Sequence, residues 1–134
     1  SHIVIELSGI AEPKNVVDML SMVGMAPKVV TLLDSSTFCT EYMEYKRLHE
    51  RPDLVDSIDH AIEGKVVELL VEQVEAADVV VLNKTDLAEV DDLKATEELV
   101  EALNSNASIL ETSFGQISLD EIISKSAKAA TEAE

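Results

Sequence analysis

The apolar residues of this chain fall into short unbroken runs and longer periodic stretches. Four runs carry almost no polar alternation, and they cover residues 3–7, 28–34, 78–82 and 107–112. Runs of this kind are typical of strands that are covered on both faces. The stretches between them repeat their apolar residues at helical spacing. Strands separated by helices predict an α/β fold with a mainly parallel sheet of about four strands.

The first helix is predicted from its ends as well as from its apolar stripe. Pro13 suits the first turn of a helix, and Gly24 suits its end. The residues of this helix that are expected to face inward are Val16, Val17, Leu20 and Val23. The pattern over residues 38–50 is ambiguous, and we expect this stretch to be helical in part.

Later helices are predicted from their apolar stripes and from one cap. A long helix is expected before the third run, and a further helix from about Asp91. Ser118 and Glu121 have the spacing of a capping box, which predicts that the last helix starts there. We therefore expect one domain over residues 1–123 and a helix end with a tail over residues 124–134.

Composition changes the expected partners more than the expected fold. The 134 residues include 10 basic and 27 acidic side chains, which gives a formal net charge of −17. Such a surface repels phosphate backbones and anionic lipid, so nucleic acid and membranes are not expected as partners. The one cysteine, Cys39, permits no internal disulfide, and no stretch resembles a signal peptide or a membrane span. These features favour a cytoplasmic protein.

The third run leads directly into four polar residues, Asn83, Lys84, Thr85 and Asp86. In parallel α/β sheets, ligands bind at the carboxyl ends of the strands. A carboxylate held there can accept two parallel hydrogen bonds from the ring N–H and exocyclic amine of guanine, a donor pair that adenine lacks. We expect Asp86 to select the base in this way, Asn83 to brace the loop and reach the other edge of the base, and the Lys84 stem to lie along the ring. An ordinary strand-to-helix turn is the alternative.

Two further strand ends carry candidate site residues. Glu6 and Gly9 close the first run, where an acidic group would lie beside the water shell of Mg²⁺ and a glycine N–H would approach a γ-phosphate. A plain turn is the alternative for this pair. Ser113 follows the fourth run and is a candidate to bring backbone N–H groups to the base carbonyl, although a turn before the Ser118 cap explains it nearly as well.

Four segments together resemble the CobW-type GTPases, which are P-loop proteins regarded as metallochaperones. The segments are IVIELSGIAEP, VVTLLDSSTF, LLVEQVEAADVVVLNKTDL and LNSNASILETSFGQISLDEII. The resemblance runs from residue 1 to about residue 123, which would make this part a partial GTP-binding domain. The Glu at position 6, where most GTPases carry Asp, is typical of the wider group that includes the nickel GTPases of urease and hydrogenase.

The resemblance implies a doubly wound sheet of the P-loop NTPase type and a parent protein that binds GTP and Mg²⁺. The parent would hydrolyse GTP slowly and deliver Zn²⁺ or Co²⁺ to metalloprotein clients, and a homodimer of the parent stays open. Carried over to this chain, Glu6 and Gly9 take the metal-water and γ-phosphate roles. The guanine base would be bound by Asn83, Lys84 and Asp86.

The sequence also departs from the family pattern. No G-x-x-x-x-G-K-[ST] phosphate loop is present, and the family's Cys-x-Cys-Cys motif and C-terminal domain are missing as well. We expect the chain to be the central piece of a longer protein, and we predict that these residues alone neither hydrolyse GTP nor bind it tightly. Without the phosphate-loop strand, the runs at 28–34, 78–82 and 107–111 should form a three-stranded block. The run at 3–7 should then lie beside a gap or have moved.

Two other functions stay open at this point. One is a sibling accessory GTPase for nickel or cobalamin enzymes, which the missing N-terminal motif would distinguish. The other is a non-catalytic doubly wound domain for signalling or interaction, such as a receiver. A receiver needs an acidic cluster around a phosphorylatable Asp, and Asp34 finds no clear partner of this kind in the sequence. In the GTPase interpretation, Asp34 would only support the site.

Overall fold

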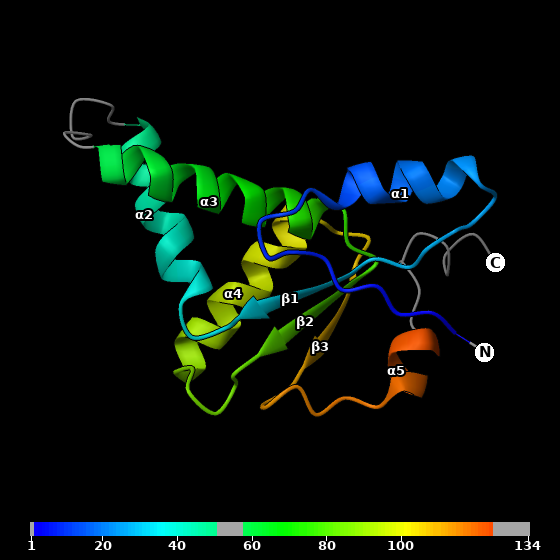
Figure 1. Ribbon diagram of the computed structural model, residues 1–134. Coiled ribbons are helices and arrows are strands. Elements are labelled where there is room, and N and C mark those ends of the chain that lie inside the picture. The colour runs from blue at the N-terminus through cyan, green and yellow to red at the C-terminus, as the bar shows by residue number, and fades with distance from the viewer. Residues whose placement is uncertain (1, 51–57, 125–134) are drawn as a thin grey trace.

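Strands and helices alternate along the chain. The computed structural model describes residues 2–50 and 58–124, and Figure 1 labels their elements. These are α1 (Pro13–Met22), β1 (Val30–Asp34), α2 (Phe38–Glu50), α3 (Ile58–Glu75), β2 (Val79–Asn83), α4 (Val90–Leu103), β3 (Ser108–Glu111) and α5 (Leu119–Ser124). The α/β fold class predicted from the apolar runs is therefore confirmed.

The sheet has three parallel strands in the order β1-β2-β3 among the described residues. This arrangement confirms the predicted block formed by the second, third and fourth apolar runs. The central strand is β2, and its last residue, Asn83, lies opposite Asp34, the last residue of β1. The polar ends of two strands are thus placed side by side at one edge of the sheet.

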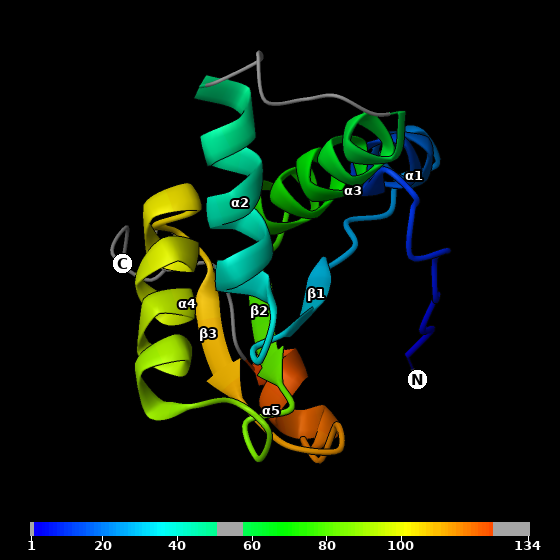
Figure 2. The ribbon, with the colours of Figure 1, turned by 90° about the vertical axis from the view of Figure 1, so that its left-hand side faces the viewer.

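The central strand is buried on both faces, as its unbroken apolar run predicts. Val79, Val80, Val81 and Leu82 are each at most 2% exposed. Val80 and Leu82 belong to a core with residues of α2, α3 and α4, namely Phe38, Val74 and Val100. Val79 and Val81 belong to a second core, against which Ile117 and Ile122 pack. Figure 2 shows the corresponding layers, with α2, α3 and α4 on one side of the sheet and α5 on the other.

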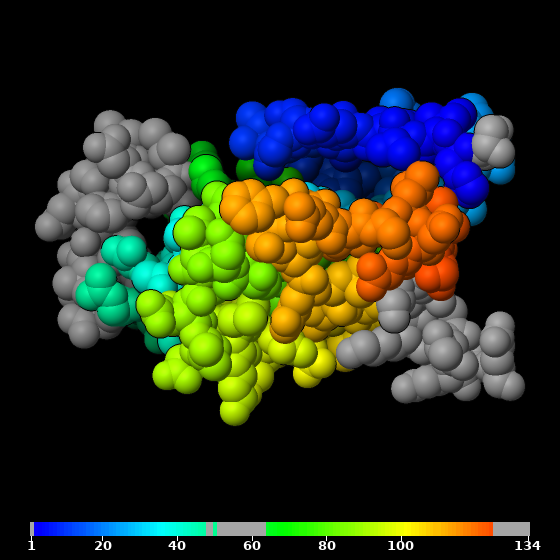
Figure 3. Space-filling view, turned by 90° about the horizontal axis from the view of Figure 1, so that it is seen from below, coloured from blue at the N-terminus to red at the C-terminus, as the bar shows by residue number. Residues whose placement is uncertain are grey.

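The strand predicted over residues 3–7 is not formed. These residues belong to no strand, and Ile3 and Val4 are each 79% exposed. They lie beyond β1, on the side away from β2 (Figure 2), and Figure 3 shows a hollow between the N-terminal segment and the segment that follows β3. An extended segment becomes a strand only when a neighbour accepts its backbone hydrogen bonds. Here β1 pairs with β2 alone among the described residues, so the sheet has three strands rather than about four.

The first helix has the predicted ends but a looser attachment than expected. Pro13 occupies its first turn, and Gly24 follows it at φ +80°, a conformation that glycine adopts without strain. No residue of α1 is buried, and Val23, expected to face inward, is 72% exposed. The side chain of Gln73 on α3 donates to the backbone just before α1. The segment before the helix is therefore anchored mainly by polar contacts.

Two further predicted elements, the helix after β1 and the cap of the last helix, are formed. Residues 38–50 are helical throughout, and the Ser118 hydroxyl accepts a hydrogen bond from the backbone N–H of Glu121 at 3.2 Å, as a cap at the start of α5. The predicted tail lies almost wholly outside the described residues, so its boundary stays a prediction. None of the described helices is long and apolar enough to cross a membrane.

Candidate functional site

The loops that follow β2 and β3 adjoin at the carboxyl end of the sheet. In Figure 3 the segment after β2 (green) and the segment after β3 (orange) lie together on one face. Two hydrogen bonds hold them together, one between backbone groups and one to a side chain. The N–H of Thr85 donates to the carbonyl of Thr112 at 3.2 Å, and the N–H of Gly115 donates to Oδ1 of Asn83 at 3.0 Å. Both loops are therefore held in a defined relative position.

Asn83 links all three strand ends. Its backbone carbonyl accepts hydrogen bonds from both the N–H and the hydroxyl of Ser35, at 3.0 and 2.6 Å, just after β1. Its side-chain oxygen accepts the bond from Gly115, after β3. The residue thus sits between two loops that come from different strands. A side chain used in this way braces the loop rather than pointing freely into solvent.

Lys84 is tied to the end of β1. Its Nζ lies 2.8 Å from Oδ2 of Asp34, whose other oxygen accepts from the N–H and hydroxyl of Ser36. Burial acts to raise the pKa of Asp34, but the hydrogen bonds from Lys84 and Ser36 outweigh it and hold that pKa below its ordinary value of 3.8. The same hydrogen bond raises the pKa of Lys84. Both groups are therefore charged at neutral pH, and the lysine stem is fixed at its far end.

Asp86 is the exposed carboxylate of this loop. The loop turns on the carbonyl of Lys84, which accepts hydrogen bonds from the N–H groups of Leu87 and Ala88 at 3.0 and 3.2 Å. Within the described part of the chain, the side chain of Asp86 makes no hydrogen bond, and its charge helps to raise the pKa of Lys84. The N-cap of α4 is Glu89, which makes no side-chain cap. The Asp86 carboxylate is therefore not used as a helix cap, and its oxygens are available to a ligand.

Ser113 and Gly115 share the loop after β3 but have different contacts. The carbonyl of Ser113 accepts the N–H of Gln116 at 3.2 Å, which closes a turn, while the N–H that reaches Asn83 comes from Gly115. Ser113 was the predicted residue on this loop, and its role toward the base stays a prediction, whereas Gly115 was not predicted. The available signal was a glycine three residues after the fourth apolar run, and this glycine has φ +65°.

The N-terminal segment, which includes Glu6 and Gly9, lies beyond β1, on the side away from β2 (Figure 2). Both residues are exposed. The carbonyls of Gly9 and Ala11 accept hydrogen bonds from Nε2 of Gln73, at 3.0 and 3.1 Å. No group of three or more His, Cys, Asp or Glu side chains that could hold a metal ion occurs among the described residues. Mg²⁺ usually keeps several waters and needs only one or two carboxylates beside nucleotide phosphates, so the Mg²⁺ role of Glu6 stays a prediction for the complete protein.

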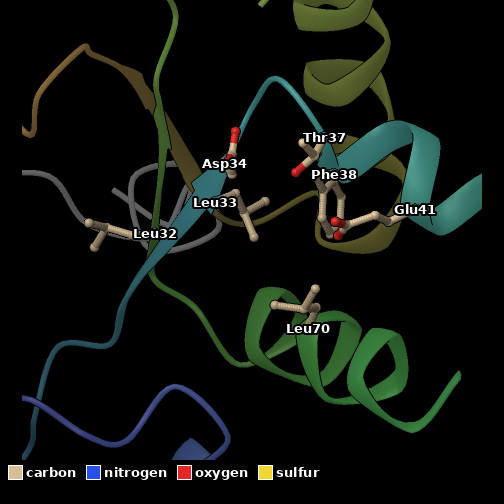
Figure 4. A pocket seen from close by; sticks show the side chains of 7 residues that line it. All are labelled: Leu32, Leu33, Asp34, Thr37, Phe38, Glu41 and Leu70. Carbon is tan, nitrogen blue, oxygen red and sulfur yellow. The ribbon is translucent and has the colours of Figure 1, made fainter. Parts of the chain in front are cut away.

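A small cavity lies beside the end of β1, between that strand, α2 and α3. Its volume is about 90 Å³, and its lining is mostly apolar: Leu32, Leu33, Asp34, Thr37, Phe38, Glu41 and Leu70 (Figure 4). Ligand pockets usually have at least roughly 300 Å³, so this cavity is too small for a nucleotide. The candidate base site is the exposed pair of loops and not this cavity.

A parallel sheet with joined polar loops at the carboxyl ends of its strands is typical of doubly wound α/β domains, which bind ligands at these ends, and it is consistent with a domain of the P-loop NTPase type. The chain belongs to the family described as CobW/HypB/UreG, nucleotide-binding domain, whose profile matches residues 1–111.

Two curated relatives are similar to most of this chain. The zinc-regulated GTPase metalloprotein activator 1 of Dictyostelium discoideum is 29% identical over 133 residues, which cover 91% of this chain and 27% of the relative. The zinc chaperone CobW of a Sinorhizobium species is 31% identical over 126 residues, which cover 87% of this chain and 34% of the relative. The chain thus spans about a quarter to a third of these proteins. No solved structure matches it.

Proposed function

We propose that this chain supplies guanine recognition to a GTP-binding domain whose complete protein is a GTPase metallochaperone. The family assignment supports nucleotide binding, and the names of both relatives refer to zinc. Zn²⁺ is accordingly the favoured cargo, with Co²⁺ as the second choice, and metalloprotein clients are the receivers. The zinc names favour the CobW branch over the nickel or cobalamin-enzyme branch. We place the complete protein in the cytoplasm.

The observation that carries this proposal is the placement of Asp86. Its carboxylate is exposed and has no hydrogen-bond partner among the described residues, while its loop is fixed to the loop after β3 by two hydrogen bonds. A carboxylate that makes no hydrogen bond, on a loop held beside a strand end, suits the paired donors of guanine. A base without that donor pair would leave the carboxylate unsatisfied, which is a strong basis for selection.

The other site residues have supporting roles in this proposal. Asn83 braces the loop and reaches the base, and the Asp34 ion pair holds the Lys84 stem along the ring. Ser113 lies on the loop that would approach the base carbonyl.

Glu6 and Gly9 act on Mg²⁺-bound water and the γ-phosphate only in the complete protein. Because no phosphate loop is present in these 134 residues, the chain alone binds GTP weakly and does not hydrolyse it.

The experiment is a titration of the ¹⁵N-labelled chain with guanosine, inosine and adenosine, followed by NMR. Nucleosides avoid the missing phosphate contacts and the repulsion from the acidic surface. We expect shifts at residues 83–88 and 112–116 with guanosine, at a dissociation constant on the order of 1 mM. Inosine lacks the exocyclic amine and should bind more weakly, and adenosine more weakly still. The Asp86→Asn variant should lose guanosine and gain xanthosine, because xanthosine carries an acceptor where guanosine carries the amine.

Asp91→Asn is the matched control, because Asp91 is an exposed carboxylate in the first turn of α4. It should leave the order of the nucleosides unchanged. Equal binding of guanosine and adenosine, or an Asp86→Asn variant that behaves as the original chain, would contradict the proposal. A micromolar affinity for GTP would contradict the statement that the chain alone binds it weakly.

A further inference from the structure

Backbone strain is concentrated at the two loops that frame the proposed base site. Of the non-glycine residues in 2–50 and 58–124, two have positive φ: Lys84 at 59° and Phe114 at 54°. This left-handed region is unfavourable for bulky side chains. Such residues persist where the surrounding structure imposes them, and they cluster at ligand sites.

The two strained residues flank a single hydrogen bond. Lys84 follows Asn83, whose side-chain oxygen accepts the N–H of Gly115, and Phe114 precedes that glycine. One strained residue therefore lies on each of the two loops at the point where the loops are joined. The Lys84 stem is already proposed to lie along the base. The position of Phe114 on the adjoining loop suggests that its ring contacts the same base.

Packing within this chain does not explain why Phe114 adopts a strained backbone conformation. Its side chain is 80% exposed, although its backbone conformation would suit glycine or asparagine better. A single exposed apolar side chain is ordinary in a folded protein. An aromatic ring that is both exposed and held in a strained conformation gains nothing from the fold that would offset the strain. A ligand that covers the ring would supply the missing contact.

The loop holds the backbone at Phe114 in place before any ligand arrives. The N–H of Gln116 donates to Ser113, the N–H of Ile117 donates to Gly115 at 2.9 Å, and the hydroxyl of Thr112 donates to the carbonyl of Gln116 at 3.0 Å. These bonds fix the turn on both sides of Phe114. A loop whose backbone is already ordered loses less freedom when a ligand binds to it.

We infer that the ring of Phe114 stacks on the guanine base, on the face opposite the Lys84 stem. This inference rests on the proposed function and adds a residue to it. Aromatic stacking is tolerant of the base because every base has a flat π face. Phe114 therefore supplies affinity without selectivity, and Asp86 supplies selectivity.

The test uses three substitutions at position 114 in the nucleoside titration. Phe114→Gly and Phe114→Asn remove the ring and suit the left-handed backbone, so the melting temperature should stay the same or rise. The affinity for guanosine should fall roughly fivefold to more than a hundredfold. The ratio of guanosine to inosine affinity should not change. Phe114→Trp should retain binding, and since the chain has no other Trp, quenching of its fluorescence by guanosine reports the stack directly.

Met22→Ala is the control for loss of an exposed apolar side chain, because Met22 is 86% exposed on α1. It should leave guanosine binding unchanged. Unchanged guanosine affinity in Phe114→Gly, while Asp86→Asn still loses it, would overturn the stacking role and leave the proposed function intact. A fall in melting temperature in both ring-free variants would show a structural role instead and would also overturn it. If the original chain shows no guanosine binding, the stacking role falls together with the proposed function.

Discussion

The two parts of the predicted nucleotide site differ in what supports them. The base side lies at the end of β2, a central strand with a neighbour on each edge, and Asn83 is hydrogen-bonded to segments after β1 and after β3. The phosphate side, with Glu6 and Gly9, lies on a segment with no strand neighbour in the described structure. Both parts follow similar apolar runs in the sequence, so the difference between them comes from their neighbours and not from their composition.

Because of this difference, the base side is held by strand pairing and apolar packing, whereas the phosphate side is held mainly by hydrogen bonds from Gln73. The apolar residues of β2 are fully covered, whereas Val4 in the N-terminal run remains 79% exposed. The hydrophobic contribution depends on the area removed from water, so equal side chains contribute unequally here. The base side should therefore keep its geometry in this chain, and the phosphate side should acquire its geometry only with further contacts.

The largest expected effect is a difference in stability between two identical truncations, one in each region. Val80→Ala removes two methyl groups from a fully buried site and should lower the free energy of unfolding by roughly 2 kcal/mol. Val4→Ala removes the same atoms from an exposed site and should change it by less than about 0.5 kcal/mol. Urea unfolding followed by circular dichroism measures both. Equal losses would show that residues 3–7 are packed in solution, and the comparison between the two regions would fail.

The same contrast shows how far sequence could predict the structure. The run at 79–82 identified a buried strand correctly, because its neighbours are present in the chain and their runs were visible. The run at 3–7 gave the same signal, but a run of apolar residues does not reveal whether a partner strand is available. The gap beside it was predictable only through the resemblance to a family with one more strand.

At the candidate site, short-range features were predictable and long-range partners were not. The polar residues after β2 could be read from the sequence because they follow a buried run directly. Their partners could not, because Asp34 lies 50 residues before Lys84 and Gly115 lies 32 residues after Asn83. The register of Asp34 opposite Asn83 brings the first pair together. The strained backbone at Phe114 is a property of the loop conformation and has no signature in the residue type.

The next largest effect concerns the hydrogen bond between Asn83 and Gly115, which joins the two loops. Asn83→Ala removes the acceptor for the N–H of Gly115 and should cost about 1 kcal/mol in unfolding free energy, with weaker guanosine binding as well. Asn83→Asp keeps an acceptor oxygen in place and should retain most of the stability. Urea unfolding measures the change in stability, and the nucleoside titration measures the change in guanosine binding. The bracing role would be wrong if both substitutions had the same effect on stability. Glu6→Gln, on the phosphate side, should change neither quantity.

A smaller effect concerns the ion pair at the end of β1 and its dependence on pH. Because the folded pKa of Asp34 is lowered, the pair stabilises the fold above pH 3.8 and this contribution is lost as the pH falls through the folded value. Because the folded pKa of Lys84 is raised, its share is present below pH 10.5 and is lost only as the pH rises through that higher value. Asp34→Asn should therefore lower the melting temperature slightly at about pH 6, and the difference should shrink at about pH 3. A difference that is equal at both values would contradict the assignment.

The smallest effect tests how the phosphate side is held. Gln73→Ala removes two hydrogen bonds, an exposed one to the carbonyl of Gly9 and a part-buried one to the carbonyl of Ala11, so global stability should change by at most about 1 kcal/mol. Release of this anchor should instead speed hydrogen exchange at the N–H of Ala11, which is bonded to Ser8 at 2.9 Å. Residues 79–83 should keep their protection because their bonds lie within the sheet. Glu72→Ala, at an exposed neighbouring position, is the control and should leave both regions unchanged. Faster exchange in β2 after Gln73→Ala would contradict this prediction and would show that loss of the anchor also loosens the sheet.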